Sequence, residues 1–369
     1  MKIAQIAPLI ESVPPKFYGG TERVVHYLTE SLVSMGHEIT LFASGDSITS
    51  ARLVATCEKS LRKSNLLSAT PCFQVIQLKE IMRLSHEFDL LHFHTDFLHF
   101  PWLSQTSIPH LTTLHGRQDL QELKLIYKHF PNETLVSISD NQRKPVAKAN
   151  FLKTVYHGLP EDLHKKGEGK GGYLAFLGRI SPEKGIDQAI QIAIKANIPL
   201  KIAAKIDPLE TSYFEDHIKQ LMHHPLIEFG GEISEAEKTD FLGSAMALLF
   251  PICWEEPFGM VLIESMSCGT PVIAYARGSV TEIIQDGVDG FLVNNVEQAL
   301  AALKNVESLN RSVIRGSFEQ KFTAKKMAKN YIETYEKAIA STKKPSIRSL
   351  IQPKSKLHNP SNTLISKLI

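Results

Sequence analysis

Short apolar runs alternate along this chain with longer stretches of helical period, and turn residues separate them. This alternation is typical of parallel sheets covered by helices, because a parallel strand needs a crossover before its neighbour can pair with it. Two such series can be followed, each about the size of one doubly wound domain. The strands expected are 2–7, 38–43, 90–94, 110–114, 135–138 and 154–156 in the first series, and 173–177, 200–204, 227–229, 247–250, 271–274 and 290–293 in the second.

The segment 160–172, PEDLHKKGEGKGG, separates the two series and has almost nothing to bury. The length of 369 residues also favours at least two domains, at about 100–200 residues each. We therefore expect an N-terminal domain over 1–160, a linker over 161–172 and a C-terminal domain over 173–317. One or two helices are expected over 318–340, able to pack on either domain.

Charge and cysteine usage exclude several protein classes. The net charge is +2, and the six basic residues of 341–369, which contains no acidic residue, leave the remainder slightly acidic. The body is therefore not expected to bind nucleic acid, and the tail is expected to be disordered, or else a basic arm that contacts lipid or RNA. The four cysteines form no CxxC pair, so neither a zinc ribbon nor a disulfide scaffold is indicated. A reducing cytoplasm is the simplest location.

No window reaches the roughly 18 uninterrupted apolar residues of a membrane span, so any membrane contact would be peripheral. A basic segment at Lys59, Arg62 and Lys63, expected as a helix, is either a solvated face or a weak sign of contact with an anionic lipid surface.

Two glutamates are eight residues apart after the apolar strand 247–250: Glu256 in a loop, and Glu264 in a helix expected to begin near Phe258. Helical rise places their carboxylates on the order of 10 Å apart, which is the length of a nucleotide sugar. Because a carboxylate can accept two hydrogen bonds from a vicinal diol, one glutamate suits ribose hydroxyls and the other suits hexose hydroxyls. A capping glutamate followed by an ordinary helical glutamate is the alternative that the spacing leaves open.

The loop GRISPEKG, expected at 178–185, places Arg179 and Lys184 beside the N-terminus of a helix that opens near residue 186. These cations could neutralise a diphosphate and stabilise the charge that grows on it as it leaves. The chain has no Asp-x-Asp motif to hold a metal ion for that purpose. Surface ion pairs with Glu183 or other acids are the alternative.

Gly19 and Gly20 follow the first strand and precede a helix expected over 21–35. Glycines here let backbone N–H groups approach a phosphate closely, although GGTER is not the GxGxxG fingerprint of dinucleotide binding. A plain turn with Thr21 as the helix N-cap is the alternative.

Three histidines gather at strand ends of the first domain: His92, His94 and His115. Three imidazoles could ligate zinc, but a histidine at a strand end more often hydrogen-bonds a substrate or a backbone carbonyl. His115 follows a central strand, so we expect it to contact the transferred group, with a purely structural role as the alternative.

These motifs together resemble the glycosyltransferase family 4 enzymes of the GT-B fold, over about residues 1–340. Glu256 and Glu264 form the E-x7-E signature in EEPFGMVLIE, which SMSCGTPVIA follows, and GRISPEKG and YGGTER fall in the expected order. The resemblance implies an α/β architecture of two doubly wound Rossmann-like domains that face a central cleft. The linker motif departs from the family pattern, because His157-Gly-Leu-Pro160 replaces the more common Asn-Gly-Ile-Asp.

The resemblance also implies roles for individual residues. The C-terminal domain would bind a nucleotide-diphosphate sugar, with UDP favoured over GDP as the nucleotide. Glu264 would contact the ribose of the donor, and Arg179 and Lys184 would contact its diphosphate. Glu256 would lie near the hexose, with Phe258 and Gly259 beside it. Gly19 and Gly20 would close over the phosphates, and His115 would contact the transferred sugar. Family members retain the anomeric configuration without a metal or cofactor, by a front-face route in which the departing phosphate helps to take the acceptor proton. The late helix 318–340 would cross back to the first domain.

The resulting hypothesis is a retaining hexosyltransferase that acts on a hydroxyl of a saccharide, lipid or small-molecule acceptor. Two alternatives remain. A nucleotide-sugar 2-epimerase uses the same scaffold without an acceptor, and a non-catalytic subunit would only bind the nucleotide sugar. The variable loops 46–77 and 98–107 are expected to shape the acceptor site, and the sequence indicates neither the acceptor nor the oligomeric state.

Overall fold

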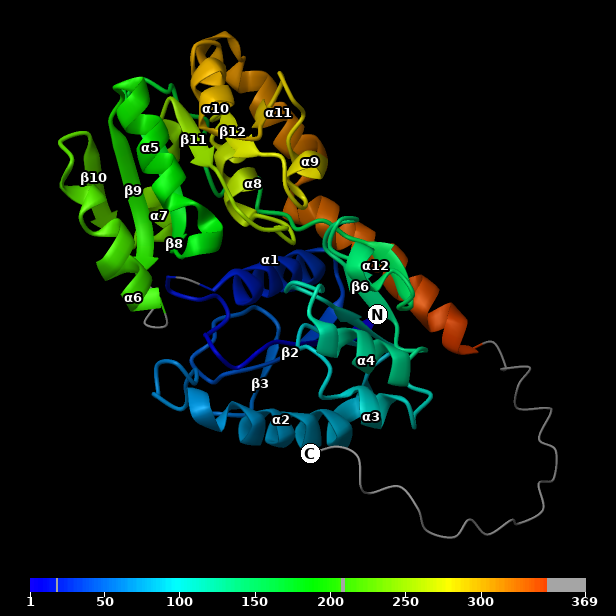
Figure 1. Cartoon of the computed structure of the whole chain (residues 1–369). Coiled ribbons are helices and arrows are strands. Elements are labelled where there is room, and N and C mark those ends of the chain that lie inside the picture. Colours follow the sequence, from blue (N-terminus) through cyan, green and yellow to red (C-terminus); the bar gives the residue numbers. More distant parts are fainter. Residues whose placement is uncertain (18, 207–209, 344–369) are drawn as a thin grey trace, which may run out of the picture.

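The computed structural model describes residues 1–17, 19–206 and 210–343, and it forms two stacked α/β units with a long helix along one side (Figure 1). The tail expected over 341–369 lies outside the described residues from 344 onward. Its first three residues belong to the last helix.

The N-terminal unit is built on a seven-stranded parallel sheet with the strand order β3-β2-β1-β4-β5-β6-β7. Its strands are β1 (Lys2–Ile6), β2 (Glu38–Ala43), β3 (Arg52–Ala55), β4 (Leu90–Phe93), β5 (His110–Thr113), β6 (Leu135–Ser137) and β7 (Phe151–Thr154). Its helices are α1 (Gly20–Ser34), α2 (Thr70–Leu84), α3 (Phe100–Leu103) and α4 (Gln121–His129).

The C-terminal unit has a six-stranded parallel sheet with the order β10-β9-β8-β11-β12-β13. Its strands are β8 (Leu174–Ile180), β9 (Leu200–Ile206), β10 (Ile227–Gly231), β11 (Ala247–Phe250), β12 (Val272–Tyr275) and β13 (Gly290–Val293). Its helices are α5 (Ile186–Ala196), α6 (Thr211–Tyr213), α7 (Glu235–Gly243), α8 (Met260–Ser267), α9 (Val280–Ile283), α10 (Val296–Leu303) and α11 (Arg311–Lys321).

Strand order reverses at one place in each sheet, between β1 and β4 and between β8 and β11. Doubly wound sheets bind ligands in the crevice outside the carboxyl ends of the strands at such a point. The glycine pair follows β1, the Arg-Lys motif begins at the end of β8 and continues into the loop after it, and the first motif glutamate follows β11. The fold therefore presents all three motifs at the two switch points.

The last helix, α12 (Ala324–Lys343), leaves the C-terminal unit and runs along the N-terminal one (Figure 1). It packs against α1 and β5, and Tyr331 and Tyr335 on this face are fully buried. A bridge between Leu159 and Thr323 joins the start of this helix to the segment that connects the two units. The first and last parts of the chain thus share one core.

Several element boundaries differ from those expected. β8 continues through Arg179 to Ile180, so the cationic motif begins within a strand and not in a loop. β7 ends at Thr154, where the strand 154–156 was expected to begin, and β3 was not expected at all. The basic segment at Lys59, Arg62 and Lys63 forms turns instead of a helix. None of the described helices has the length and apolar character to cross a membrane.

Candidate active site in the interdomain crevice

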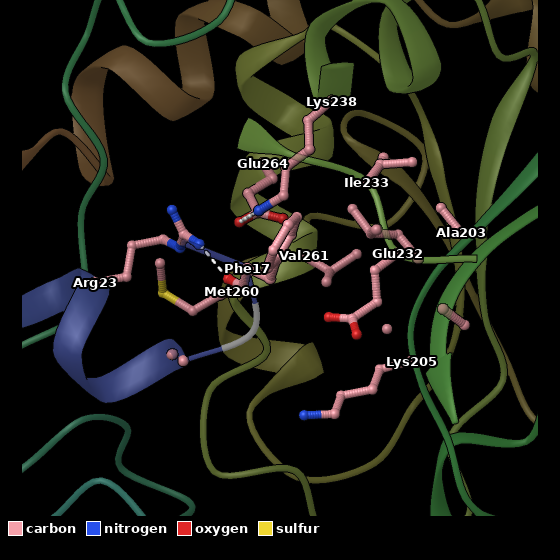
Figure 2. A pocket seen from close by; sticks show the side chains of 15 residues that line it. Phe17, Arg23, Ala203, Lys205, Glu232, Ile233, Lys238, Met260, Val261 and Glu264 are labelled. Carbon is pink, nitrogen blue, oxygen red and sulfur yellow. Dashed lines mark hydrogen bonds and ion pairs between the residues drawn. The ribbon is translucent and has the colours of Figure 1, made fainter. Parts of the chain in front are cut away.

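Two adjoining cavities lie between the units. The larger has a volume of about 380 Å³, and the smaller, shown in Figure 2, has a volume of about 120 Å³. Both are lined by residues from the start of α1, the end of β8 and the start of α8: Gly19, Gly20, Leu177, Gly178, Met260 and Val261. Because the two cavities share these walls, one ligand could extend through both.

The structure brings the sequence-predicted residues together at this crevice. The larger cavity is lined by Gly19, Gly20, His115, Arg179, Lys184, Glu256, Phe258 and Gly259. Glu264 lines the smaller cavity, opposite the same glycine pair. The two motif carboxylates therefore occupy neighbouring chambers and are not scattered over unrelated surfaces.

Lys184 and Glu256 form an ion pair inside the larger cavity, with Nζ 2.5 Å from Oε2. The same carboxylate oxygen accepts a hydrogen bond of 2.9 Å from the indole N–H of Trp254, whose ring centroid lies 5.0 Å from the ammonium. The lysine follows β8 and the glutamate follows β11, so neighbouring strands position the pair. A diphosphate would compete with Glu256 for this ammonium.

A close backbone approach holds the loop of Lys184 in place. Gly185 has φ 66°, and a Cβ there would lie 2.0 Å from the carbonyl oxygen of Pro251. The amide of Cys253 also donates to the carbonyl of Glu183 at 2.9 Å. Only glycine fits this contact, which ties the loop after β8 to the loop after β11.

Arg179 also lines the larger cavity, and its Nη2 donates to Glu183 at 2.8 Å. The ion pair with Glu183 considered from sequence is therefore present, and the guanidinium still belongs to the cavity wall.

Glu264 is buried on α8, and Lys238 from α7 holds its Oε1 at 2.8 Å (Figure 2). Its Oε2 has no hydrogen-bond partner among the residues that the structure describes. A buried carboxylate oxygen without a partner is costly, and a ligand hydroxyl would satisfy it. This acid is thus arranged to accept a hydrogen bond in the smaller cavity.

An ion-pair network connects this carboxylate to the other unit. Lys238 also contacts Glu235 at 3.1 Å, and Glu235 pairs with Arg23 of α1 at 2.6 Å. Burial opposes the charge of Glu235, yet the neighbouring His164 and the two cations outweigh burial and lower its pKa to about 2.

Sequence reasoning gave Arg23, Glu235 and Lys238 no role. The capping-box pattern of Ser234 and Glu237, which begins α7, was the signal that could have placed two of them beside a strand end.

The glycine pair does not act as the plain turn considered from sequence. α1 begins at Gly20 with Gly19 as its N-cap, so Thr21 is not the capping residue. Gly19 has φ 156°, and a Cβ there would lie 2.7 Å from Pro15 Cβ. A Cβ on Gly20 would meet only open space. The two glycines therefore present backbone without a side chain to the cavities.

His115 lines the larger cavity and stacks on His157, with ring centroids 5.2 Å apart. Burial lowers the pKa of His115 to about 3, so this ring is neutral at physiological pH. The imidazoles considered as zinc ligands are hydrogen-bonded to other groups: His92 to Tyr335 and Thr113, and His94 to Gln5 and His115. His157, named from sequence only as a departure in the linker motif, forms part of the cavity wall.

Two family models match the chain, one for each unit. The model described as glycosyl transferases group 1 matches residues 160–332, and the model described as glycosyltransferase family 4 matches residues 18–148. An uncharacterized glycosyltransferase of Methanocaldococcus jannaschii is 26% identical over 275 residues, which is 68% of this chain and 76% of that protein.

Solved structures share the fold. Sucrose-phosphate synthase from Thermosynechococcus elongatus has a TM-score of 0.76 at 17% identity, covering 92% of this chain and 100% of that one. Anabaena HepE in complex with UDP and glucose has a TM-score of 0.67 at 20% identity, covering 91% and 100%.

Two parallel-sheet units that face a crevice at their switch points are the GT-B fold, which this chain shares with sucrose-phosphate synthase. With a family domain in each unit, the chain is a glycosyltransferase of the family 4 type.

Proposed function

We propose that this enzyme transfers a hexose from a nucleotide-diphosphate sugar, UDP-linked in preference to GDP-linked, to a hydroxyl of a saccharide, lipid or small-molecule acceptor. The reaction retains the anomeric configuration and needs no metal or cofactor. One observation carries the proposal: Arg179, Lys184 and the two motif glutamates converge on two adjoining cavities between the units.

Charge complementarity supports this placement of the donor. Lys184 and Arg179 meet the diphosphate in the larger cavity, where they stabilise the charge that develops on the leaving nucleotide diphosphate. Glu264 accepts ribose hydroxyls in the smaller cavity, and Glu256 lies near the hexose. The UDP and glucose in the HepE complex are what a related fold binds, and they favour UDP.

The proton balance needs no protein nucleophile. The glycosidic bond to the diphosphate breaks, the acceptor oxygen attacks from the same face, and a phosphate oxygen of the leaving group takes the acceptor proton. Closure of the crevice excludes water during this step.

A soluble or membrane-anchored acceptor fits the same chemistry, and a lipid acceptor would bring the enzyme to a membrane surface. The four cysteines are free thiols, which favours action in the reducing cytoplasm.

The test combines donor turnover with product analysis. The protein is incubated with UDP-glucose, UDP-N-acetylglucosamine or GDP-mannose, with and without a mixed pool of saccharide and lipid acceptors, in buffer with and without chelator. Acceptor-dependent nucleotide release and a retained anomer, both insensitive to chelator, are expected. Conversion of UDP-N-acetylglucosamine without an acceptor would instead identify an epimerase, and binding without turnover would identify a non-catalytic subunit.

A binding measurement tests the place of the ribose. Glu264→Ala should weaken UDP binding, because the ribose hydroxyls lose a charged acceptor worth about 1.5–3 kcal/mol. Calorimetric titration of both proteins with UDP measures the difference. Equal affinities would exclude this position for the ribose.

A further inference from the structure

A continuous chain of buried hydrogen bonds leads from the last helix to the wall of the larger cavity. The Gln5 side-chain amide donates to the hydroxyl of Tyr335 at 3.0 Å, and its Oε1 lies 2.7 Å from Nε2 of His94. Nδ1 of His94 lies 2.9 Å from Nε2 of His115. Tyr335 and His115 are 330 and 110 positions from Gln5 in the sequence, so only the fold brings the three residues together.

The Gln5 amide has its nitrogen toward Tyr335 and its oxygen toward His94, and this placement sets the direction of the hydrogen bonds in this chain. The amide oxygen of Gln5 can only accept, so the hydrogen must be on Nε2 of His94. In a neutral imidazole, Nδ1 of His94 then has no hydrogen and accepts from Nε2–H of His115. Nε2 of His115 is thereby occupied as a donor, and Nδ1 of His115 is left as an acceptor.

Burial supports this assignment independently. It lowers the pKa of His94 well below its usual value and that of His115 to about 3, so both rings are neutral at physiological pH. Nδ1 of His115 is buried and has no hydrogen-bond partner among the described residues. A buried N–H without an acceptor is less acceptable in a folded protein than a bare lone pair, which again places the hydrogen on Nε2.

A side branch closes the other end of the network. The Tyr335 hydroxyl accepts from Gln5, and its own hydrogen has Nδ1 of His92, 2.8 Å away, as the acceptor among the described residues. Nε2–H of His92 then donates to the hydroxyl of Thr113 at 2.7 Å, and Thr113 contacts the hydroxyl of Tyr331 at 2.9 Å. The branch thus has a consistent set of donors and acceptors. Tyr335 holds the orientation of the Gln5 amide.

We propose that Gln5, oriented by Tyr335, acts through His94 as a positioning residue that fixes the tautomer of His115. The only ring atom of His115 left for a ligand is Nδ1, and it is an acceptor. A ligand must therefore offer a hydrogen-bond donor to this ring. With the proposed function, on which this step rests, that donor is one hydroxyl of the transferred sugar. The last helix thereby sets the hydrogen-bonding preference of a site residue in the other half of the chain.

The tautomer can be read directly in the ligand-free protein. Nitrogen-15 NMR of the histidine-labelled full chain distinguishes Nδ1–H from Nε2–H rings, and loss of one ring's signals in His115→Gln assigns His115. The wild type should show His115 as the Nε2–H tautomer. The Nδ1–H form, alone or in a mixture, overturns the proposal.

Two matched variants on α12 separate positioning from packing. Tyr335→Phe and Tyr331→Phe each remove one fully buried hydroxyl from the same helix face, but only Tyr335 contacts Gln5. Tyr335→Phe should introduce the Nδ1–H form of His115, whereas Tyr331→Phe should not. If the Nδ1–H form of His115 appears in both variants, or in neither, the role of Gln5 is contradicted.

Substitutions of Gln5 provide a second comparison. Gln5→Met removes the acceptor of the His94 Nε2–H, so the Nδ1–H form of His115 should appear. Gln5→Glu has a carboxylate that can only accept from His94, so it should give the wild-type spectrum. If Gln5→Met fails to fold, the tyrosine pair carries the test. A Gln5→Glu spectrum with Nδ1–H on His115 contradicts the proposal.

Sugar recognition is tested separately with UDP-glucose and its monodeoxy analogues. One analogue should bind the wild type roughly twofold to tenfold more weakly than UDP-glucose, as expected for one lost hydrogen bond, and this gap should shrink in Tyr335→Phe but not in Tyr331→Phe. If the tautomer is as assigned but no analogue shows a gap, the contact between His115 and the sugar is wrong and the positioning by Gln5 stands.

Discussion

Lys184 is paired with Glu256 in the structure, and the proposed function gives it the donor diphosphate as a second partner. In the structure its ammonium pairs with Glu256 at the wall of the larger cavity, and both side chains are mostly buried. Sequence reasoning assigned each residue to a different part of the donor and did not foresee the pair, because they are 72 positions apart and meet only through adjacent strands. A donor diphosphate would draw the lysine from the glutamate and leave that carboxylate free for the hexose.

Lys184→Ala should lower kcat by about 10²–10³, because a fixed cation that stabilises the leaving group is lost. The variant also leaves Glu256 unpaired in a buried position, which adds to the loss. Lys195→Ala is the matched control, since Lys195 pairs with Glu297 on the surface at 3.6 Å, away from the cavities. Steady-state kinetics with UDP-glucose compares the three proteins. Wild-type kcat in Lys184→Ala would remove its electrostatic role.

Glu22 gives a pH dependence with a definite sign. It lines the larger cavity from α1, and burial raises its pKa to about 7 from its usual value of 4.5. Between these two values the folded state holds a proton that the unfolded state releases, so this residue lowers stability as the pH rises.

Glu22→Gln should therefore be more stable than the wild type at pH 8, by up to about 3 kcal/mol, and similar to it near pH 4.5. Urea unfolding of both proteins at a series of pH values measures the difference in free energy of unfolding. The buried histidines act on both proteins alike and cancel in the comparison. A difference independent of pH would contradict the raised pKa.

At the level of elements, strands were predicted wherever burial was complete. β2, β11 and β13 have the bounds expected, and β1, β4, β5 and β6 are each one residue shorter than expected. β3 was missed because Arg52–Ala55 is a short, half-exposed edge strand whose apolar run is only three residues long. The continuation of β8 through Arg179 was missed because Gly178 marks a turn in sequence, whereas pairing with β9 keeps the chain extended there.

The side-chain partners in the site were not predictable in the same way. The nine candidate residues line the two cavities, and each was found from a local sequence motif or from the family resemblance that these motifs carry. Lys238 and Arg23 contact the site through tertiary packing of α7 and α1, and no local pattern records which helix face meets which cavity.

Gly158 determines how the last helix docks on the connection between the units. A Cβ at this position would lie 2.4 Å from the carbonyl oxygen of Thr323, directly before α12. Gly158→Ala should therefore lower the free energy of unfolding by about 1–3 kcal/mol, since backbone must move to admit the methyl group.

Gly316→Ala is the control for Gly158→Ala, because Gly316 is exposed within α11 and a Cβ there meets no atom within 4 Å. It should raise stability by about 0.5–1 kcal/mol through helix propensity. Chemical denaturation of the two variants measures both changes. Stabilisation by Gly158→Ala would show that the contact between residues 158 and 323 is not tight.

For the whole molecule, the two units contact each other on both sides of the crevice. On one side, Glu282 accepts hydrogen bonds from the backbone amides of Asp140 and Asn141, at 2.8 and 2.6 Å. On the other, Arg23 pairs with Glu235 beside the smaller cavity. The first contact joins α9 to the loop after β6, and the second joins α1 to α7, so the two hold the units together at different places.

The Arg23–Glu235 pair is thus expected to favour the closed arrangement of the units. Arg23→Met should increase the radius of gyration measured by small-angle X-ray scattering, because it removes a mostly buried cross-crevice ion pair while keeping an unbranched side chain. Saturating UDP should reverse the increase if the donor is held from both units. Arg52→Met, which breaks the exposed pair with Glu87 within the N-terminal unit, should leave the radius unchanged. An unchanged radius in Arg23→Met would show that other contacts hold the units together, and equal changes in both variants would assign the effect to lost charge alone.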